Sequence, residues 1–198
     1  MPEPAEIHLN PGDFRFAADG ARLHTVLGSC VAITVWHPVR RIGGMCHYML
    51  PGRRPAGPAA PGRRDAAPAE PGRRLAAPAM PGLDGRFAGD AVAMFRDEVD
   101  RHGTRPQEYE VKIFGGADQF QHLDGPPGVA AQNARVGLEL LAHSGFIVSI
   151  RELGGRGSRR LIFELATGHV WLRSFEPFDG QDPGLPGGVG MSPGAPAR

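Results

Sequence analysis

The sequence has little of what a disulfide-rich, metal-bound or membrane-inserted protein needs. Its 198 residues include only two cysteines, Cys30 and Cys46, too few for a disulfide framework or for the paired motifs of a structural zinc site. No apolar run approaches the roughly 18 residues that cross a bilayer, and the N-terminus lacks the basic-then-apolar pattern of a signal peptide. We therefore expect a cytoplasmic protein without direct membrane insertion.

An excess of charge of one sign is also lacking. The chain carries 22 basic and 21 acidic residues, a formal net charge of +1. A near-neutral balance gives no basic surface for nucleic acid, so we expect no nucleic-acid partner. The length is that of one domain large enough to bury a core.

Two segments differ from the rest in composition. Residues 51–82 repeat a ten-residue unit that begins "PGRR", and residues 176–198 are rich in proline and glycine. Neither segment has enough β-branched or aromatic residues to offset the entropy of ordering, so both are predicted to be disordered. A solvated insert is favoured over an arginine contact with an acidic partner. The prediction is a single domain over 1–175, interrupted by 51–82 and followed by a disordered tail.

The remaining residues alternate between strand-like and helix-like patterns. Helices are expected over 89–103, where Val92, Phe95 and Val99 share one face, and over 129–145, where Val136 and Leu140 mark an apolar stripe. Strands are expected over 6–9, 13–17, 22–27, 31–36, 42–50, 108–117, 146–153 and the two arms of a hairpin over 159–175. Many strands and two good helices predict the α+β class: a layered α/β sandwich of packed mixed β-sheets with two main flanking helices.

The strongest chemical candidate is the pair Cys30 and His47. If 31–36 and 42–50 form a hairpin that turns at Pro38-Val39, Cys30 and His47 face each other directly, with Cβ atoms about 5 Å apart. Histidine at that separation can take the thiol proton and lower the cysteine pKa below its free value of about 8.5. The spacing predicts a thiolate–imidazolium pair of the kind used by cysteine nucleophiles.

The residues around this pair fit a nucleophile. Gly28 and Ser29 directly precede the thiol, where a sharp turn exposes it and aims backbone N–H groups at a developing oxyanion. The Thr25 hydroxyl could hold the far imidazole nitrogen, as the third member of a triad does. Cys46 precedes His47 on the same strand, so it points to the opposite face and is expected to be a small buried residue.

The pattern of residues leaves three further roles open for the two cysteines. A buried core cysteine is common, and a zinc site or a Cys30–Cys46 disulfide is disfavoured by ligand number, facing and a reducing compartment. Two glycine-rich stretches, 114–117 and 153–155, do not complete a phosphate-binding motif and are predicted to be turns at strand ends, near the cleft. We expect no cofactor and no metal.

The segment "TVLGSCVAITVWHPVRRIGGMCHYMLPGR" closely resembles the signature of the CheD family, the chemoreceptor glutamine deamidases of bacterial chemotaxis. The resemblance continues in "GRFAGDAVAMF", "KIFGGADQF", "QNARVGLELL" and "ELGGRGSRRLIFELATGHVWLR", so it covers about residues 5–175 apart from the insert. It implies a layered α/β sandwich without a cofactor, and hydrolysis of receptor glutamine side chains to glutamate and ammonia.

By position, the resemblance places Cys30 on the family's nucleophile, His47 on its catalytic histidine and Thr25 on the assisting threonine. Some members have one more residue before "LGSC", so His24 is the alternative for the third position. Implied partners are methyl-accepting chemotaxis receptors as substrate and a CheC-type chemotaxis phosphatase. A non-catalytic adaptor and a cysteine hydrolase of another amide or ester are the alternative functions.

Overall fold

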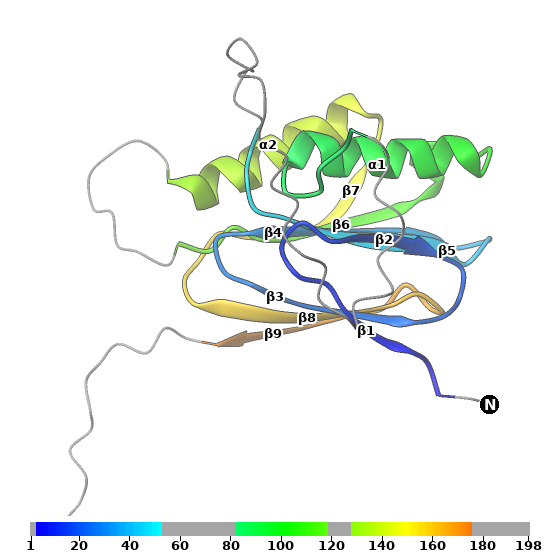
Figure 1. Ribbon diagram of the computed structural model, residues 1–198, viewed down its shortest axis with the longest axis horizontal. Coiled ribbons are helices and arrows are strands. Elements are labelled where there is room, and N and C mark those ends of the chain that lie inside the picture. The colour runs from blue at the N-terminus through cyan, green and yellow to red at the C-terminus, as the bar shows by residue number, and fades with distance from the viewer. Residues whose placement is uncertain (1–2, 53–81, 119–127, 176–198) are drawn as a thin grey trace, which may run out of the picture.

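The protein folds into three layers: a pair of helices, a five-stranded sheet and a four-stranded sheet (Figure 1). The computed structural model describes residues 3–52, 82–118 and 128–175. The predicted disorder of the insert and of the tail falls almost wholly outside these residues. The predicted fold class, a layered α+β sandwich of mixed sheets with two flanking helices, is confirmed.

The five-stranded sheet lies in the middle of the molecule. Its strand order is β2-β5-β4-β6-β7, and the strands are β2 (Phe14–Ala17), β4 (Val31–His37), β5 (Ile42–Tyr48), β6 (Glu110–Gly115) and β7 (Val148–Leu153). Helices α1 (Ala88–Arg101) and α2 (Val129–His143) cover its outer face (Figure 1). Because both faces of this sheet are covered, β5 is buried along its whole length.

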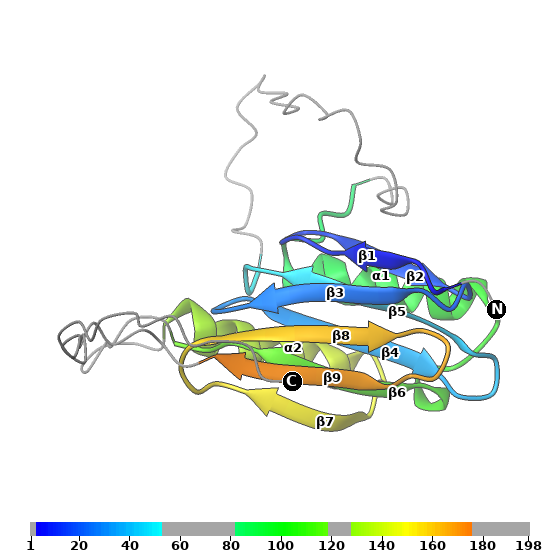
Figure 2. The ribbon, with the colours of Figure 1, turned by 90° about the horizontal axis from the view of Figure 1, so that it is seen from below.

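The four-stranded sheet packs against the inner face of the first. Its order is β1-β3-β8-β9, and the strands are β1 (Glu6–His8), β3 (Arg22–Leu27), β8 (Ser158–Glu164) and β9 (Val170–Phe175). Seen from below, β3, β8 and β9 cross in front of the helices (Figure 2). The chain passes from one sheet to the other through the bend at 28–30, between β3 and β4.

Two apolar clusters fill the spaces between the layers. One lies between the helices and the five-stranded sheet and includes Val31, Ile33, Tyr48 and Phe95. The other lies between the sheets and includes residues of both, among them Leu23, Leu27, Ala32, Met45 and Phe163. Each strand of the β4–β5 hairpin therefore sends alternate side chains to different clusters.

The apolar face predicted for α1 matches the buried face of that helix more closely than the one predicted for α2. Val92, Phe95 and Val99 of α1 are buried, as expected. In α2, Val136 and Leu140 are only partly buried, but both pack against the core cluster, as expected for members of an apolar stripe. The fully buried face is one position away, at Ala130, Asn133, Gly137 and Leu141, because Gly137 allows the helix to lie against Tyr48.

Candidate functional site

Thr25, Cys30 and His47 all border the layer between the sheets. Thr25 comes from β3 on the four-stranded sheet and His47 from β5 on the five-stranded sheet. Cys30 ends the bend that connects the sheets, and its side chain packs against the inter-sheet cluster. Thr25 and His47 are 4% and 2% exposed, whereas Cys30 is half-buried.

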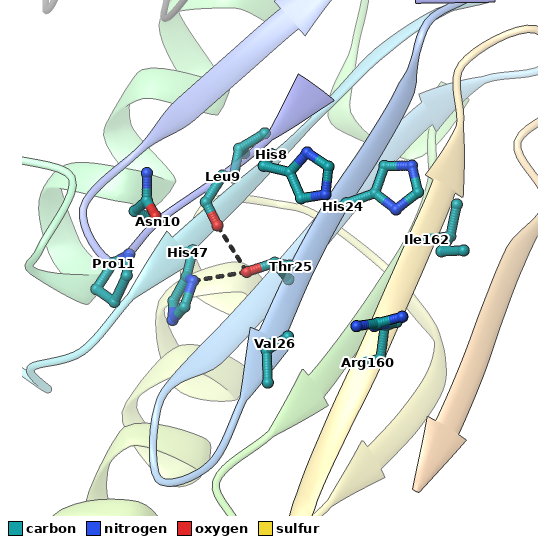
Figure 3. A pocket seen from close by; sticks show the side chains of 10 residues that line it. All are labelled: His8, Leu9, Asn10, Pro11, His24, Thr25, Val26, His47, Arg160 and Ile162. Carbon is teal, nitrogen blue, oxygen red and sulfur yellow. Dashed lines mark hydrogen bonds between the residues drawn. The ribbon is translucent and has the colours of Figure 1, made fainter. Parts of the chain in front are cut away.

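A chain of hydrogen bonds fixes the imidazole of His47 (Figure 3). The Thr25 hydroxyl donates to the Leu9 carbonyl at 2.9 Å, and its oxygen lies 2.8 Å from His47 Nδ1. A hydroxyl has one hydrogen, which Thr25 gives to Leu9, so Nδ1–H must be the donor to Thr25. The hydrogen-bond pattern therefore assigns the neutral tautomer with its proton on Nδ1 and a lone pair on Nε2.

His47 Nε2 has the properties of a general base. It is buried and has no hydrogen-bond partner among the residues that the structure describes. Burial lowers the pKa of His47 below its ordinary value, against smaller opposing effects from the Leu9 carbonyl and Asp13. The ring is therefore neutral at pH 7, with its lone pair available to accept a proton.

The Cys30–His47 register predicted from the sequence is wrong by two residues. His47 pairs with Ala32, and the β4–β5 ladder ends at Val31 and Tyr48, one residue short of Cys30. The hairpin turns through four residues, 38–41, with Arg41 at φ 52°. A two-residue turn at Pro38-Val39 would need positive φ at Pro38, which the proline ring forbids.

A shift of two residues keeps both side chains on the same face, because strand side chains alternate with period two. In this register Cys30 lies diagonal to His47 and one residue beyond the ladder; diagonal Cβ atoms within a ladder are on the order of 7 Å apart. The described residues include no hydrogen bond between Sγ and Nε2. Burial raises the pKa of the Cys30 thiol, only partly offset by a hydrogen bond with Ser29, so the predicted resting thiolate is not found.

Glycines bring a second loop tightly against the backbone of the bend. Gly116 N–H donates to the Cys30 carbonyl at 2.8 Å, and Ala117 N–H donates to the Gly28 carbonyl at 2.9 Å. At Gly115, φ is +110° and a Cβ would lie 2.2 Å from the Cys30 oxygen. Only glycine fits this approach. As predicted, residues 114–117 lie at a strand end and Gly116 lines the cavity at Cys30, but Phe114 and Gly115 belong to β6 and no turn is assigned at 116–117.

Cys30 opens into a cavity of about 730 Å³. Its walls are Met49 and Leu50, which follow β5, the start of α2, and three glycines, Gly116, Gly154 and Gly155. Most of these groups are small or apolar, so the cavity can admit a side chain close to the thiol. A second cavity, of about 460 Å³, is lined by His47 together with Thr25 (Figure 3).

The other two sequence candidates, His24 and Cys46, make different contacts, although His24 also lines the cavity at His47. His24 lies on the outer face of β3, where its Nε2 contacts Glu6 and its ring stacks on His8. Thr25, and not His24, therefore contacts His47. Cys46 is fully buried on the helix side of the sheet, and burial raises its pKa to about 12, as expected for a small core residue.

Sequence reasoning missed Asn133 and Leu9. Asn133 of α2 is fully buried, and its amide donates to the carbonyls of Ser29 and Met49. The sequence did carry a signal: Asn133 is a polar residue three positions after Ala130, on the helix face that also carries Leu141. Leu9 contributes through its backbone carbonyl, for which the sequence carries no signal.

Metal binding and membrane crossing find no support in the described residues, 3–52, 82–118 and 128–175. These ranges hold no group of three or more His, Cys, Asp or Glu side chains arranged to bind a metal ion. Neither α1 nor α2 in these ranges has the length and apolar character of a bilayer-spanning helix.

A family model described as "CheD chemotactic sensory transduction" matches residues 71–174. "Probable chemoreceptor glutamine deamidase CheD 3" of Dechloromonas aromatica (strain RCB) is 41% identical over 176 residues, covering 85% of this chain and 89% of that relative. "Probable chemoreceptor glutamine deamidase CheD" of Pseudomonas savastanoi pv. phaseolicola (strain 1448A / Race 6) is 41% identical over 172 residues, covering 85% and 84%.

A solved structure is a more distant match. The "hypothetical protein YfiH" of Bacillus licheniformis aligns with a TM-score of 0.43 and 16% identity, over 73% of this chain and 51% of that chain. A likeness at this level supports no inference about fold or function.

Proposed function

Because the chain belongs to the CheD family, we propose that it hydrolyses glutamine side-chain amides on chemoreceptors, with Cys30 as nucleophile and His47 as base and acid. One observation carries the proposal. His47 presents a buried lone pair with no partner among the described residues, on the face and in the layer where Cys30 lies. A neutral imidazole held by Thr25 beside a half-buried thiol is the arrangement that activates a cysteine.

The first half of the reaction makes a thioester. The Cys30 S–H proton moves to His47 Nε2 while sulfur attacks the carboxamide carbon, and backbone N–H groups of the 28–30 bend hold the oxyanion. The C–N bond then breaks, and the imidazolium returns that proton to the nitrogen, which leaves as ammonia.

The second half regenerates the enzyme. Water gives a proton to His47 Nε2 as its oxygen attacks the thioester carbon, and the C–S bond breaks. The imidazolium protonates the departing sulfur, leaving glutamate on the receptor. Throughout, Thr25 accepts from Nδ1–H, so Nε2 is the only nitrogen that exchanges protons.

The raised pKa of the Cys30 thiol defines how this chemistry starts. In the resting site both partners are neutral, so sulfur is activated as it attacks and not beforehand. A rotation of the Cys30 side chain about its first torsion is the movement that would bring Sγ toward Nε2. The resting thiol is therefore less nucleophilic than a thiolate, and its reaction with an electrophile is faster when His47 accepts its proton.

The proposed function also implies a protein substrate. The substrate is a receptor segment that places a glutamine side chain in the cavity beside Cys30. A CheC-type phosphatase as a further partner stays a prediction from the family resemblance, and a cytoplasmic location stays a prediction from the sequence pattern.

The proposal is tested on the cytoplasmic part of a chemoreceptor incubated with the purified chain. Specific receptor glutamine peptides are expected to gain about 1 Da as NH2 is replaced by OH, with one ammonia released per modified residue. Peptide mass spectrometry and an ammonia assay measure the two products. Receptor peptides unchanged at every glutamine, with a folded enzyme in excess, would contradict the proposal.

The hydroxyl of Thr25 provides a second test. In Thr25→Val the buried Nδ1–H of His47 and the Leu9 carbonyl lose their hydrogen-bond partner, which costs about 1–3 kcal/mol of stability. The tautomer of His47 is then no longer fixed. We expect kcat of ammonia release to fall by about 10²-fold. Thr25→Ser keeps the hydroxyl and should stay near wild type. Equal kcat values for Val and Ser would show that Thr25 does not orient the ring.

A further inference from the structure

Asn133 connects helix α2 to both segments that carry the proposed catalytic pair. Its Nδ2 donates to the carbonyl of Ser29 at 3.1 Å and to the carbonyl of Met49 at 3.0 Å. Two carbonyl oxygens can be bonded only by the NH2 end of the amide, so the side-chain orientation is fixed. Asn133 is 0% exposed, and its Oδ1 has no partner among the residues that the structure describes.

The two carbonyls lie close in sequence to the proposed catalytic residues. Ser29 directly precedes Cys30, and Met49 lies two residues after His47. The β4–β5 ladder ends at Val31 and Tyr48, so its last pair lies just short of both carbonyls. The amide of Asn133 continues the connection between the two strands at the point where their own hydrogen bonds end.

The helix itself is anchored at the same place. Tyr48 donates its hydroxyl to the Asn133 backbone carbonyl at 2.8 Å. Gly137, one turn further along α2, makes room for that hydroxyl, since a Cβ there would lie 2.1 Å from it. Residues 128–131 and Ala134 of this part of α2 also line the cavity at Cys30. One hydrogen-bonded unit thus joins helix, cavity wall and both catalytic segments.

We propose that Asn133 is a positioning residue for the deamidation: its amide sets the distance between Cys30 Sγ and His47 Nε2 by holding the backbone beside each. This inference rests on the proposed function of Cys30 and His47. Loss of either hydrogen bond of the Asn133 amide lets the bend at 28–30 move relative to β5. Misplacement of reacting groups by about 1 Å costs rate on the order of 10²-fold, even when binding is unchanged.

The test compares Asn133→Ala with Asn133→Asp and with Thr104→Val. The Asp variant keeps the shape of the amide but has at most one hydrogen to donate. Thr104→Val is the control for lost stability, because it removes a part-buried hydroxyl that bonds Val99 and Tyr109 beyond the end of α1. Both Asn133 variants are expected to lose about 10²-fold in kcat with KM within a few-fold, whereas Thr104→Val keeps kcat.

A second readout separates positioning from a merely structural role. The alkylation rate of Cys30 by iodoacetamide is measured by mass spectrometry, with and without His47→Gln. The His47 change should slow alkylation in the wild-type background and have little effect when Asn133 is Ala or Asp, since the two groups are then uncoupled.

The outcomes distinguish two failures. A wild-type kcat in a folded Asn133 variant, or an undiminished effect of His47 on alkylation in it, would overturn the role of Asn133 and leave the deamidase proposal standing. A wild-type chain that neither releases ammonia nor shows any effect of His47 on Cys30 would overturn the proposed function, and the positioning role with it.

Discussion

Cys30→Ala is expected to abolish ammonia release from receptor glutamine, with kcat at least about 10³-fold below wild type. The sulfur forms the bond to the carboxamide carbon, so without it no thioester forms and the oxyanion site has nothing to stabilise. Binding should persist, because the cavity walls are formed by other residues such as Leu50, Val129 and Leu153. A coupled ammonia assay measures the rate, and co-sedimentation with receptor measures binding.

The second cysteine, Cys46, provides the control for Cys30→Ala. Cys46 is fully buried on the opposite face of the sheet, and its thiol, with a pKa of about 12, stays protonated. Cys46→Ala leaves a small cavity that costs about 1 kcal/mol of stability, and kcat should be unchanged. Ammonia release by Cys30→Ala at more than a few per cent of the wild-type rate would exclude covalent catalysis by this residue. The chain would then release ammonia by means of another group.

The strands and helices were predictable because their signals are local. Alternation of apolar and polar residues gives β3 its predicted bounds, and the same alternation decides between His24 and Thr25. Leu23 and Leu27 are buried, so Thr25, at the same parity, must face inward. His24 shares the outward parity of Arg22 and contacts Glu6 instead. This choice was open in the sequence, although the information to settle it was present.

The register of the hairpin was not predictable from the pattern alone. Period-two alternation cannot distinguish registers that differ by two residues, since each keeps the same side chains inside. The turn decides, and the four-residue turn with Arg41 at positive φ moves His47 opposite Ala32. The consequence for chemistry is direct: a diagonal thiol and imidazole are not hydrogen-bonded at rest, and the thiol pKa is raised instead of lowered.

Asn133 illustrates a different limit. Its function depends on carbonyls more than 80 positions away in the chain, at Ser29 and Met49. A helix pattern identifies a polar residue on a buried face, but it does not identify the acceptors that satisfy it. The fold class was therefore accessible from the sequence, which also named Thr25, Cys30 and His47 as candidates, whereas the contacts around them required the tertiary structure.

His47→Gln is expected to lower kcat by about 10²- to 10⁴-fold, because every proton transfer of the proposed reaction passes through Nε2. The pH dependence identifies the role. Burial lowers the pKa of His47 below its ordinary value of 6.5, so the acidic decline of wild-type kcat/KM should have its midpoint below pH 6.5. In His47→Gln the residual rate should lack this acidic decline, since no group at the position titrates.

His37→Gln is the matched control for His47→Gln. His37 is also buried, with its ring edge-on to Tyr109 at 5.0 Å and its Nδ1 accepting from Arg40 N–H, but it lies at the far end of β4. Its loss should cost stability and leave both kcat and the acidic decline intact. If His37→Gln lowered kcat as much as His47→Gln at equal stability, the loss would reflect packing of β4 and β5. If only His47→Gln removes the acidic decline, the base is the imidazole that Thr25 holds, and the rate below pH 6.5 reports its protonation.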